Sequence, residues 1–179
     1  MGERLYFAYG SNINLDQMER RCPNAQVVGP VVLENYKLLF RSNTRSAGVA
    51  TIRPHKGRKV HGLLWKITPE CEKSLDIYEG WPRLYEKEDV TVRDSSGQEF
   101  TVMAYVMTDM CKEPAVPSEH YYNGIETGYR QNGLPVPALK KAWDNCVREV
   151  QTRTEQINAR AAAPSNAPSK PSKRRNYER

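Results

Sequence analysis

The sequence predicts an α+β fold built around a small mixed or antiparallel β-barrel, with short flanking helices and an amphipathic helix towards the C-terminus. Three observations predict it. Strand-like runs follow one another with turn residues between them, helical periodicity is confined to short stretches, and the strict strand–helix alternation of a doubly wound sheet is absent. Several short strands in one small domain often close into a barrel, because closure removes exposed strand edges.

The strand-like runs are rich in β-branched and aromatic residues, which favour extended backbone. They span residues 5–9, 26–33, 36–40, 49–52, 60–66, 86–92 and 99–107. The last two are separated by Asp94-Ser95-Ser96-Gly97, which we expect to close an antiparallel hairpin with Gly97 available for a positive φ.

Helical signals are brief in the first half of the chain. A short helix is expected after Asn14, where apolar residues repeat at helical spacing before Pro23. Thr68 followed by Pro69 is typical of an N-cap and first helical residue, and this second helix should stop at Gly80. Near the C-terminus, one face of an amphipathic helix is formed by Leu139, Ala142, Trp143, Cys146, Val147 and Val150.

The length and the charge distribution bound the domain organisation. The 179 residues suit one domain, which we expect to span residues 1–160, followed by a basic disordered tail rich in Pro, Ser and Ala over residues 161–179. The net charge is +6, but residues 151–179 hold seven Lys/Arg and two Glu. Residues 1–150 therefore hold 20 Lys/Arg and 19 Asp/Glu and are nearly neutral. Nucleic-acid binding would therefore depend on the tail alone and is disfavoured.

Several other classes of protein are excluded. No apolar run approaches the roughly 20 residues needed to cross a bilayer, and no export signal is visible, so we expect a cytoplasmic protein whose four cysteines are reduced. The histidines and cysteines lack metal-ligand spacing, and no dinucleotide or Walker motif is present, so no metal and no cofactor are expected. The sequence does not fix the oligomeric state and leaves a homodimer open.

The first candidate site is the turn that follows the first strand. Gly10-Ser11-Asn12 joins that strand to the short helix expected after Asn14. A strand–turn–helix junction directs unpaired backbone N–H groups towards one place, where they can bind a carboxylate or stabilise an oxyanion, and Gly10 would let a ligand approach the backbone. A tight structural turn explains the same residues equally well.

The second candidate is Glu79, which precedes Gly80 at the expected helix end. A helix C-terminus is unfavourable for a carboxylate, and Tyr78, Trp81 and Tyr85 could shield it from water. Both effects would raise the pKa of Glu79 towards the range that a general base needs. The simpler alternative is a solvated glutamate before a C-terminal glycine.

Asp76 and Ser11 are the other candidate catalytic groups. Asp76 lies three residues earlier on the same helix and is an alternative base, or else a partner of Lys73. Ser11 lacks the G-x-S-x-G pattern of a nucleophile elbow, and no histidine is identifiable as its base. A Ser–His–Asp hydrolase is therefore disfavoured.

Four segments taken together resemble the γ-glutamylcyclotransferase family, and the likeness extends over about residues 4–142. They are residues 6–12, the Leu75-Asp76-x-x-Glu79-Gly80 segment, Tyr85, and Asn132-Gly133-Leu134-Pro135. The resemblance implies a small mixed barrel and a cofactor-independent enzyme. Such an enzyme releases 5-oxoproline from γ-glutamyl amino acids or peptides when the substrate's α-amine attacks its own γ-carbonyl.

The resemblance also implies roles for individual residues. Glu79 would be the proton acceptor and donor, and Tyr122 competes with Tyr121 for one place in the pocket. The implied substrate-binding residues are Tyr6, Phe7, Ala8, Tyr9, Gly10, Ser11, Asn12, Tyr85 and Tyr121.

The amine part of the substrate is left open. It could belong to a free dipeptide, a larger γ-glutamyl metabolite or a γ-glutamylated biosynthetic intermediate, although Asn12 favours the family branch that cuts intact glutathione over the one acting on γ-glutamyl-ε-lysine. The alternative from a different class is a non-catalytic γ-glutamyl-binding or regulatory protein on the same fold.

Overall fold

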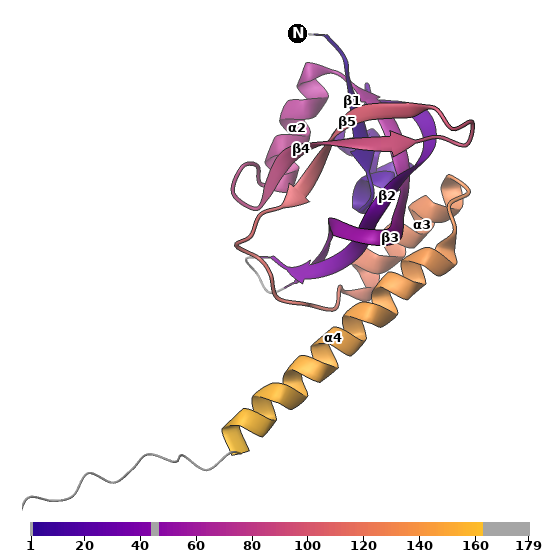
Figure 1. The fold of residues 1–179 in the computed structure, drawn as a ribbon. Coiled ribbons are helices and arrows are strands. Elements are labelled where there is room, and N and C mark those ends of the chain that lie inside the picture. The colour runs from indigo at the N-terminus through magenta and orange to yellow at the C-terminus, as the bar shows by residue number, and fades with distance from the viewer. Residues whose placement is uncertain (1, 44–46, 163–179) are drawn as a thin grey trace, which may run out of the picture.

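The computed structural model describes residues 2–43 and 47–162 (Figure 1). Its five strands close into a mixed barrel in the order β1-β3-β2-β4-β5, with helices around it, as the sequence predicts. The elements are β1 (Arg4–Ala8), η1 (Ser11–Ile13), α1 (Leu15–Arg21), β2 (Gln26–Ser42), β3 (Gly48–Ile67), α2 (Pro69–Glu79), β4 (Tyr85–Arg93), β5 (Glu99–Met107), α3 (Glu119–Gln131) and α4 (Val136–Ala162).

Strands β2 and β3 form one long antiparallel ribbon, which the sequence analysis divided into four shorter strands. The gaps predicted within each strand lie at an irregularity in the pairing of β2 with β3. Glu34 pairs with Lys59, but Tyr36, two residues later, pairs with Pro54. Residues 55–58 therefore bulge out opposite Asn35, which has a φ of 59°. A bulge bends a strand without ending it. The division into separate strands was wrong for this reason.

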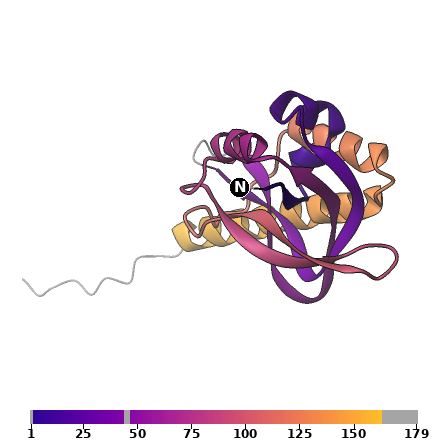
Figure 2. The same ribbon diagram turned by 90° about the horizontal axis from the view of Figure 1, so that it is seen from above.

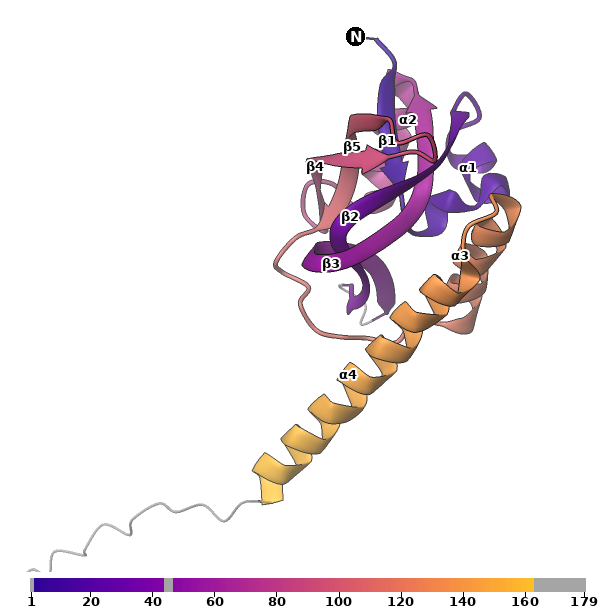
Figure 3. The ribbon, with the colours of Figure 1, turned by 45° about the vertical axis from the view of Figure 1, so that its right-hand side comes forward.

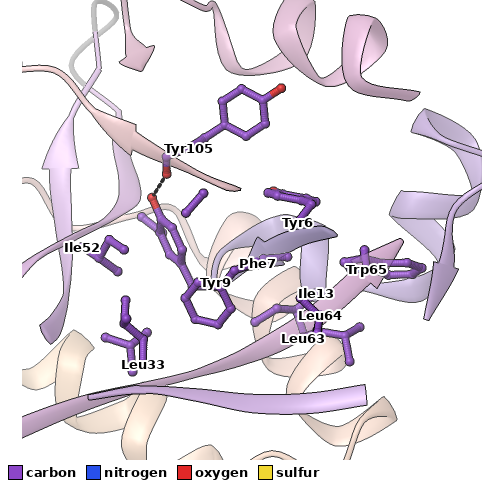
Figure 4. Packing of buried hydrophobic residues seen from close by; sticks show 14 of the residues in the cluster. Tyr6, Phe7, Tyr9, Ile13, Leu33, Ile52, Leu63, Leu64, Trp65 and Tyr105 are labelled. Atoms are coloured by element: carbon purple, nitrogen blue, oxygen red, sulfur yellow. Dashed lines mark hydrogen bonds between the residues drawn. The ribbon is translucent and has the colours of Figure 1, made fainter. Parts of the chain in front are cut away.

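The remaining pairings close the barrel. β1 is antiparallel to β3 and parallel to β5, where Tyr6 lies opposite Met103. β4 and β5 form the predicted hairpin, whose turn contains Gly97 at a φ of 89°. The enclosed core contains aromatic and aliphatic side chains from β1, β2, β3 and β5 (Figure 4).

Helix α3 was not predicted, and it lies beside α1 (Figure 2). The side chain of Gln131 at its end donates to Asp16 over 3.1 Å, and that of Asn132 donates to the carbonyl of Ile13 over 3.0 Å. Gly128 allows this approach, because a Cβ at that position would lie 2.6 Å from the backbone nitrogen of Asn14. Glycine is a weak helix former, so it weakens the helical signal in the sequence.

Helix α4 begins on the barrel and extends beyond it (Figures 1 and 3). The predicted face packs inward through Leu139, Ala142 and Cys146, whereas residues 151–162 are all exposed. The helix reaches Ala162, two residues past the predicted domain boundary, and the remainder of the predicted tail lies outside the described residues.

None of the described helices is long and apolar enough to span a membrane. All four cysteines are free thiols.

Candidate active site

A pocket of about 250 Å³ opens where β1 passes into η1. The end of α2 forms another part of its wall, so the turn and Glu79, which are 67 residues apart in the sequence, meet in one cavity. The residues that line it are Tyr6, Tyr9, Gly10, Ser11, Asn12, Asn43, Val49, Ala50, Tyr78, Glu79, Leu84, Tyr85, Tyr105 and Tyr121.

Both the backbone conformation and the limited space favour glycine at position 10. Its φ and ψ are −110° and −139°, which lie outside the helical and extended regions. A Cβ at this position would lie 3.2 Å from the Cβ of Ala50 and 3.6 Å from the hydroxyl of Tyr121. The backbone of the turn thus forms part of the pocket wall directly.

Asn12 connects the turn to Glu79. Its side chain is buried, and its Nδ2 donates to the hydroxyl of Tyr6 and to Oε1 of Glu79, both over 2.8 Å. The indole N–H of Trp65 donates to the Asn12 carbonyl over 3.1 Å and fixes the backbone behind it. The amide therefore holds one carboxylate oxygen of Glu79 in a defined position.

Glu79 is the last residue of α2, and Gly80 ends the helix in the left-handed conformation with a φ of 67°. Burial raises the pKa of the Glu79 carboxyl to about 7, although the positive charge of Arg21 and the hydrogen bond from Asn12 oppose the rise. A carboxyl group that titrates near neutral pH can both accept and release a proton during a reaction. The structure thus has the helix end that the sequence predicted, with Glu79 at the pocket.

Arg21 is the main residue that the sequence analysis missed. Its Nη1 donates to Oδ1 of Asn12 over 2.6 Å and to Oγ of Ser11 over 3.3 Å. Its Nη2 donates to Gln17 over 2.6 Å, and the guanidinium lies 3.7 Å from the centre of the Tyr78 ring. Gln17 and Arg21 are four residues apart on α1, and this helical spacing is the only signal that the sequence carried.

The Arg21 contact determines how the Asn12 amide is oriented. A guanidinium can only donate hydrogen bonds, so the oxygen of the amide must face Arg21. The amide nitrogen then faces Glu79 and Tyr6, which can both accept. Arg21 therefore positions Asn12, and through Asn12 it positions the carboxylate.

Tyrosine hydroxyls form the opposite wall of the pocket. Tyr85 donates to the Ala50 carbonyl over 2.6 Å, and the Ala50 N–H donates to the hydroxyl oxygen of Tyr121 over 3.1 Å. Tyr9 donates to the Tyr105 carbonyl (Figure 4). Burial raises the pKa of Tyr9, Tyr85 and Tyr121 above the usual value, so these phenols remain neutral. Their hydrogen bonds tie this wall of the pocket to the backbone of β3 and β5.

Three predicted or competing residues do not line this pocket. Phe7 and Ala8 are buried in the barrel core, with exposed fractions of 0% and 1%. Tyr122 packs edge-on against Trp143, with ring centres 4.7 Å apart, whereas Tyr121 reaches the pocket. The two neighbouring tyrosines therefore point to different parts of the molecule.

Asp76, the alternative base, lies outside the pocket in an ion pair. Its carboxylate accepts a hydrogen bond from the hydroxyl of Tyr105 over 2.6 Å and lies 2.8 Å from the ammonium of Lys87. Lys87, which comes from β4, takes the place that the sequence analysis gave to Lys73. Asp76 thus supports the wall behind Tyr105.

A family model described as "Gamma-glutamyl cyclotransferase, AIG2-like" matches residues 6–123, a range that includes the turn, Arg21, Glu79 and Tyr121. The chain belongs to this family. It is 37% identical over 144 residues to a γ-glutamylcyclotransferase of Bos taurus and 36% identical to one of Homo sapiens, and each alignment covers 76% of both chains. The protein is therefore a cyclotransferase enzyme.

A solved structure titled "Gamma-glutamyl cyclotransferase" superposes on the present cyclotransferase with a TM-score of 0.72. The two chains are 29% identical, and the alignment covers 96% of this chain and 94% of the other. The α+β barrel is therefore shared over nearly the whole chain, including the elements that carry the pocket.

Proposed function

We propose that this cyclotransferase releases 5-oxoproline from small γ-glutamyl amino acids and peptides, with Glu79 as the group that moves the protons. The observation that carries the proposal is a carboxyl group with a pKa of about 7 beside a turn of backbone N–H groups in one pocket. The pocket volume of about 250 Å³ lies below the range of roughly 300–1,000 Å³ typical of drug-sized ligands, which favours a glutamyl group with a small amine.

The two ends of the pocket suit the two charged groups of the glutamyl moiety. η1 begins at Ser11, and the first N–H groups of a helix have no partner within it, so the N–H groups around Gly10 and Ser11 would bind the α-carboxylate. The α-ammonium would then lie against the carboxylate of Glu79. These two contacts orient the substrate without a protein nucleophile.

The raised pKa of Glu79 makes the first proton transfer accessible. An α-amino group has a pKa of about 8, so passing its proton to a carboxylate with a pKa of about 7 costs about 1.4 kcal/mol. A glutamate with the ordinary pKa of about 4.5 would make the same step cost about 5 kcal/mol. Burial of Glu79 thus removes most of this cost.

The freed amine then attacks the γ-carbonyl carbon of the same molecule and closes the five-membered ring. The bond from that carbon to the leaving nitrogen breaks, one of the three ammonium protons stays on the ring nitrogen, and Glu79 carries the others to the leaving amine. Because the nucleophile is tethered, holding the substrate folded can supply effective molarities on the order of 10⁵ M or more.

The decisive experiment replaces Glu79 by glutamine and measures 5-oxoproline released from γ-glutamyl-alanine. Glutamine keeps the size of the side chain and can still accept the hydrogen bond of Asn12, but it cannot take the ammonium proton. We expect kcat to fall by about 10²- to 10⁴-fold while γ-glutamyl-alanine still binds through the turn, with KM raised by loss of the charge that faces the ammonium.

Glu70→Gln is the matched control, because Glu70 is exposed on the same helix and lies outside the pocket. Its turnover should remain that of the unchanged enzyme. Near-normal kcat in Glu79→Gln would exclude Glu79 as the proton carrier. Binding of γ-glutamyl-alanine without any turnover by the unchanged protein would instead favour the non-catalytic alternative.

A further inference from the structure

A second and larger hollow, of about 850 Å³, lies between the β2–β3 ribbon and helix α4, and it shares no lining residue with the active-site pocket. Helix α4 runs past the ribbon on this side of the barrel (Figure 3). We call this hollow the basic groove. The charged and histidine side chains that line it are Lys37, His55, Arg58, Lys59, His61, Lys141, Arg148, Glu149 and Arg153.

One wall of the basic groove comes from the bulge in β3. The bulge holds the sequence His55-Lys56-Gly57-Arg58 and is followed by Lys59, and Gly57, at a φ of 76°, donates its N–H to the side chain of Asn35 over 3.0 Å. This contact fixes the extra residues in place, so Arg58 and Lys59 are held at the rim. The irregularity that interrupts the ribbon thus presents positive charge.

The other wall is one face of α4. Lys141, Asn145, Arg148 and Thr152 are spaced by three or four residues and therefore share one side of the helix. Arg148 is held by a hydrogen bond of 2.5 Å to the side chain of Asn145. The two walls are thus positively charged and face each other across the hollow.

Most of these charges are not neutralised by the protein. Within residues 2–43 and 47–162, no ion pair is formed by Lys37, Arg58, Lys59 or Lys141. Arg153 is paired with Glu113, and Glu149, the single acid among the described residues that line the groove, lies 2.8 Å from Arg41. Like charges brought together in this way repel one another, and a bound anion would relieve the repulsion.

From this charge arrangement we infer that the basic groove binds a small polyanion of the polyphosphate class, such as a nucleoside triphosphate or inorganic triphosphate. Several phosphate groups on one molecule can contact both walls at once, which a single phosphate cannot do. The volume also lies within the roughly 300–1,000 Å³ of ligand pockets. The site is separate from the pocket of Glu79 and does not depend on the proposed reaction.

Two other occupants fit the basic groove less well. Single-stranded nucleic acid is usually bound by stacking its bases on aromatic side chains, and the lining contains no Phe, Tyr or Trp. A second copy of this chain, related by a twofold axis, would bring the same basic surface to both sides of the contact. A compact polyanion matches both the charge and the enclosed shape.

The test is calorimetric titration of the full chain with inorganic triphosphate at about 0.05 M and about 0.3 M salt. We expect saturable binding of one molecule per chain below about 1 mM at low salt, weakened at least fivefold at the higher salt. Lys141→Glu on the helix wall and Arg58→Glu on the strand wall should each weaken binding by about fivefold, and the double variant by more than about twentyfold.

Lys73→Glu is the matched control, because it makes the same charge change as Lys141→Glu at an exposed position on α2 outside the groove. It should change affinity by less than about twofold, and all these variants should keep normal cyclotransferase activity. The proposal fails if triphosphate does not saturate, or if Lys73→Glu weakens binding as much as Lys141→Glu. It also fails if a single-stranded RNA oligomer binds more tightly than triphosphate through the same residues.

Discussion

At the scale of single residues, the proton affinity of Glu79 reflects opposing contributions. Burial raises its pKa, whereas the charge of Arg21 and the hydrogen bond from Asn12 lower it, and the outcome is a value of about 7. Arg21 therefore acts on Glu79 in two ways, through its charge and through the orientation of the Asn12 amide. These two effects can be separated by experiment.

The pH dependence of kcat/KM should show one limb from Glu79. A base works only when deprotonated, so activity should fall below pH about 7 in the unchanged enzyme. Arg21→Gln removes a charge that lowers this pKa, so the limb should move to higher pH. Arg21→Lys keeps the charge and should leave the limb near its original position, while kcat falls because lysine lacks the planar fork that holds Asn12 and Gln17 together.

An unshifted limb in Arg21→Gln would show that the charge of Arg21 does not act on Glu79. Unchanged kcat in Arg21→Lys would show that orientation of the amide is not its contribution. Circular dichroism spectra and thermal unfolding of both variants would check that α1 remains folded.

The two neighbouring tyrosines provide a matched pair of substitutions. Tyr121→Phe removes a hydroxyl that lies in the pocket and accepts from the Ala50 N–H over 3.1 Å. Loss of one such hydrogen bond corresponds to about 1 kcal/mol, so kcat/KM should fall by about fivefold or more. Tyr122→Phe, which changes a ring packed on Trp143, should stay within about twofold. Steady-state kinetics that give the opposite order would reverse the assignment.

At the scale of elements, two other chain segments lie close to the junction of β1 with η1. β3 contributes Ala50 and α3 contributes Tyr121, and both lie against the place where a Gly10 side chain would be. The turn therefore forms part of a pocket wall. Its neighbours could not be predicted, because α3 was not recognised and β3 was divided into two strands.

A second substitution should restore the substrate affinity that is lost when Gly10 is replaced. Gly10→Ala places a methyl group about 3.2 Å from the Cβ of Ala50, so the turn must shift and KM should rise several-fold. Ala50→Gly removes the atom that the new methyl group meets first. The double variant should recover much of the lost affinity, as measured by KM for γ-glutamyl-alanine. Absence of any recovery would indicate that Gly10 acts through something other than this contact.

At the scale of the whole molecule, the active site should reduce stability. Glu79 has a pKa of about 7 in the folded state, above its ordinary value of about 4.5, so the folded state retains the proton over a pH range in which the unfolded chain has lost it. Stability should therefore fall as pH rises from about 4.5 to 7, and the loss is complete above pH 7. The barrel accommodates this cost because it also buries an extensive cluster of apolar side chains.

Glu79→Gln should accordingly stabilise the protein while inactivating it. The gain in free energy of unfolding should be larger at pH 8 than at pH 5 by about 2–3 kcal/mol, because glutamine does not ionise. Urea denaturation at the two pH values measures this difference. Glu86→Gln, at an exposed position on β4, should show no comparable gain. Equal effects of Glu79→Gln at both pH values would contradict the raised pKa.

The sequence by itself determined the features that depend on neighbouring residues. The β4–β5 hairpin, the cap at Thr68, the end of α2 at Gly80 and the position of Glu79 follow from local turn and capping chemistry, and the structure confirms each of them. The family, and with it the barrel, could be recognised because the motifs that carry it are short and contiguous.

Only the tertiary structure decided which distant residues meet. It joined the predicted short strands into one ribbon, placed Tyr121 rather than Tyr122 at the pocket, and paired Asp76 with Lys87. It also brought Arg21 to Asn12, and it gathered the scattered charges of β3 and α4 into one groove. Local patterns do not encode these contacts, because each depends on how the closed barrel and its helices pack together.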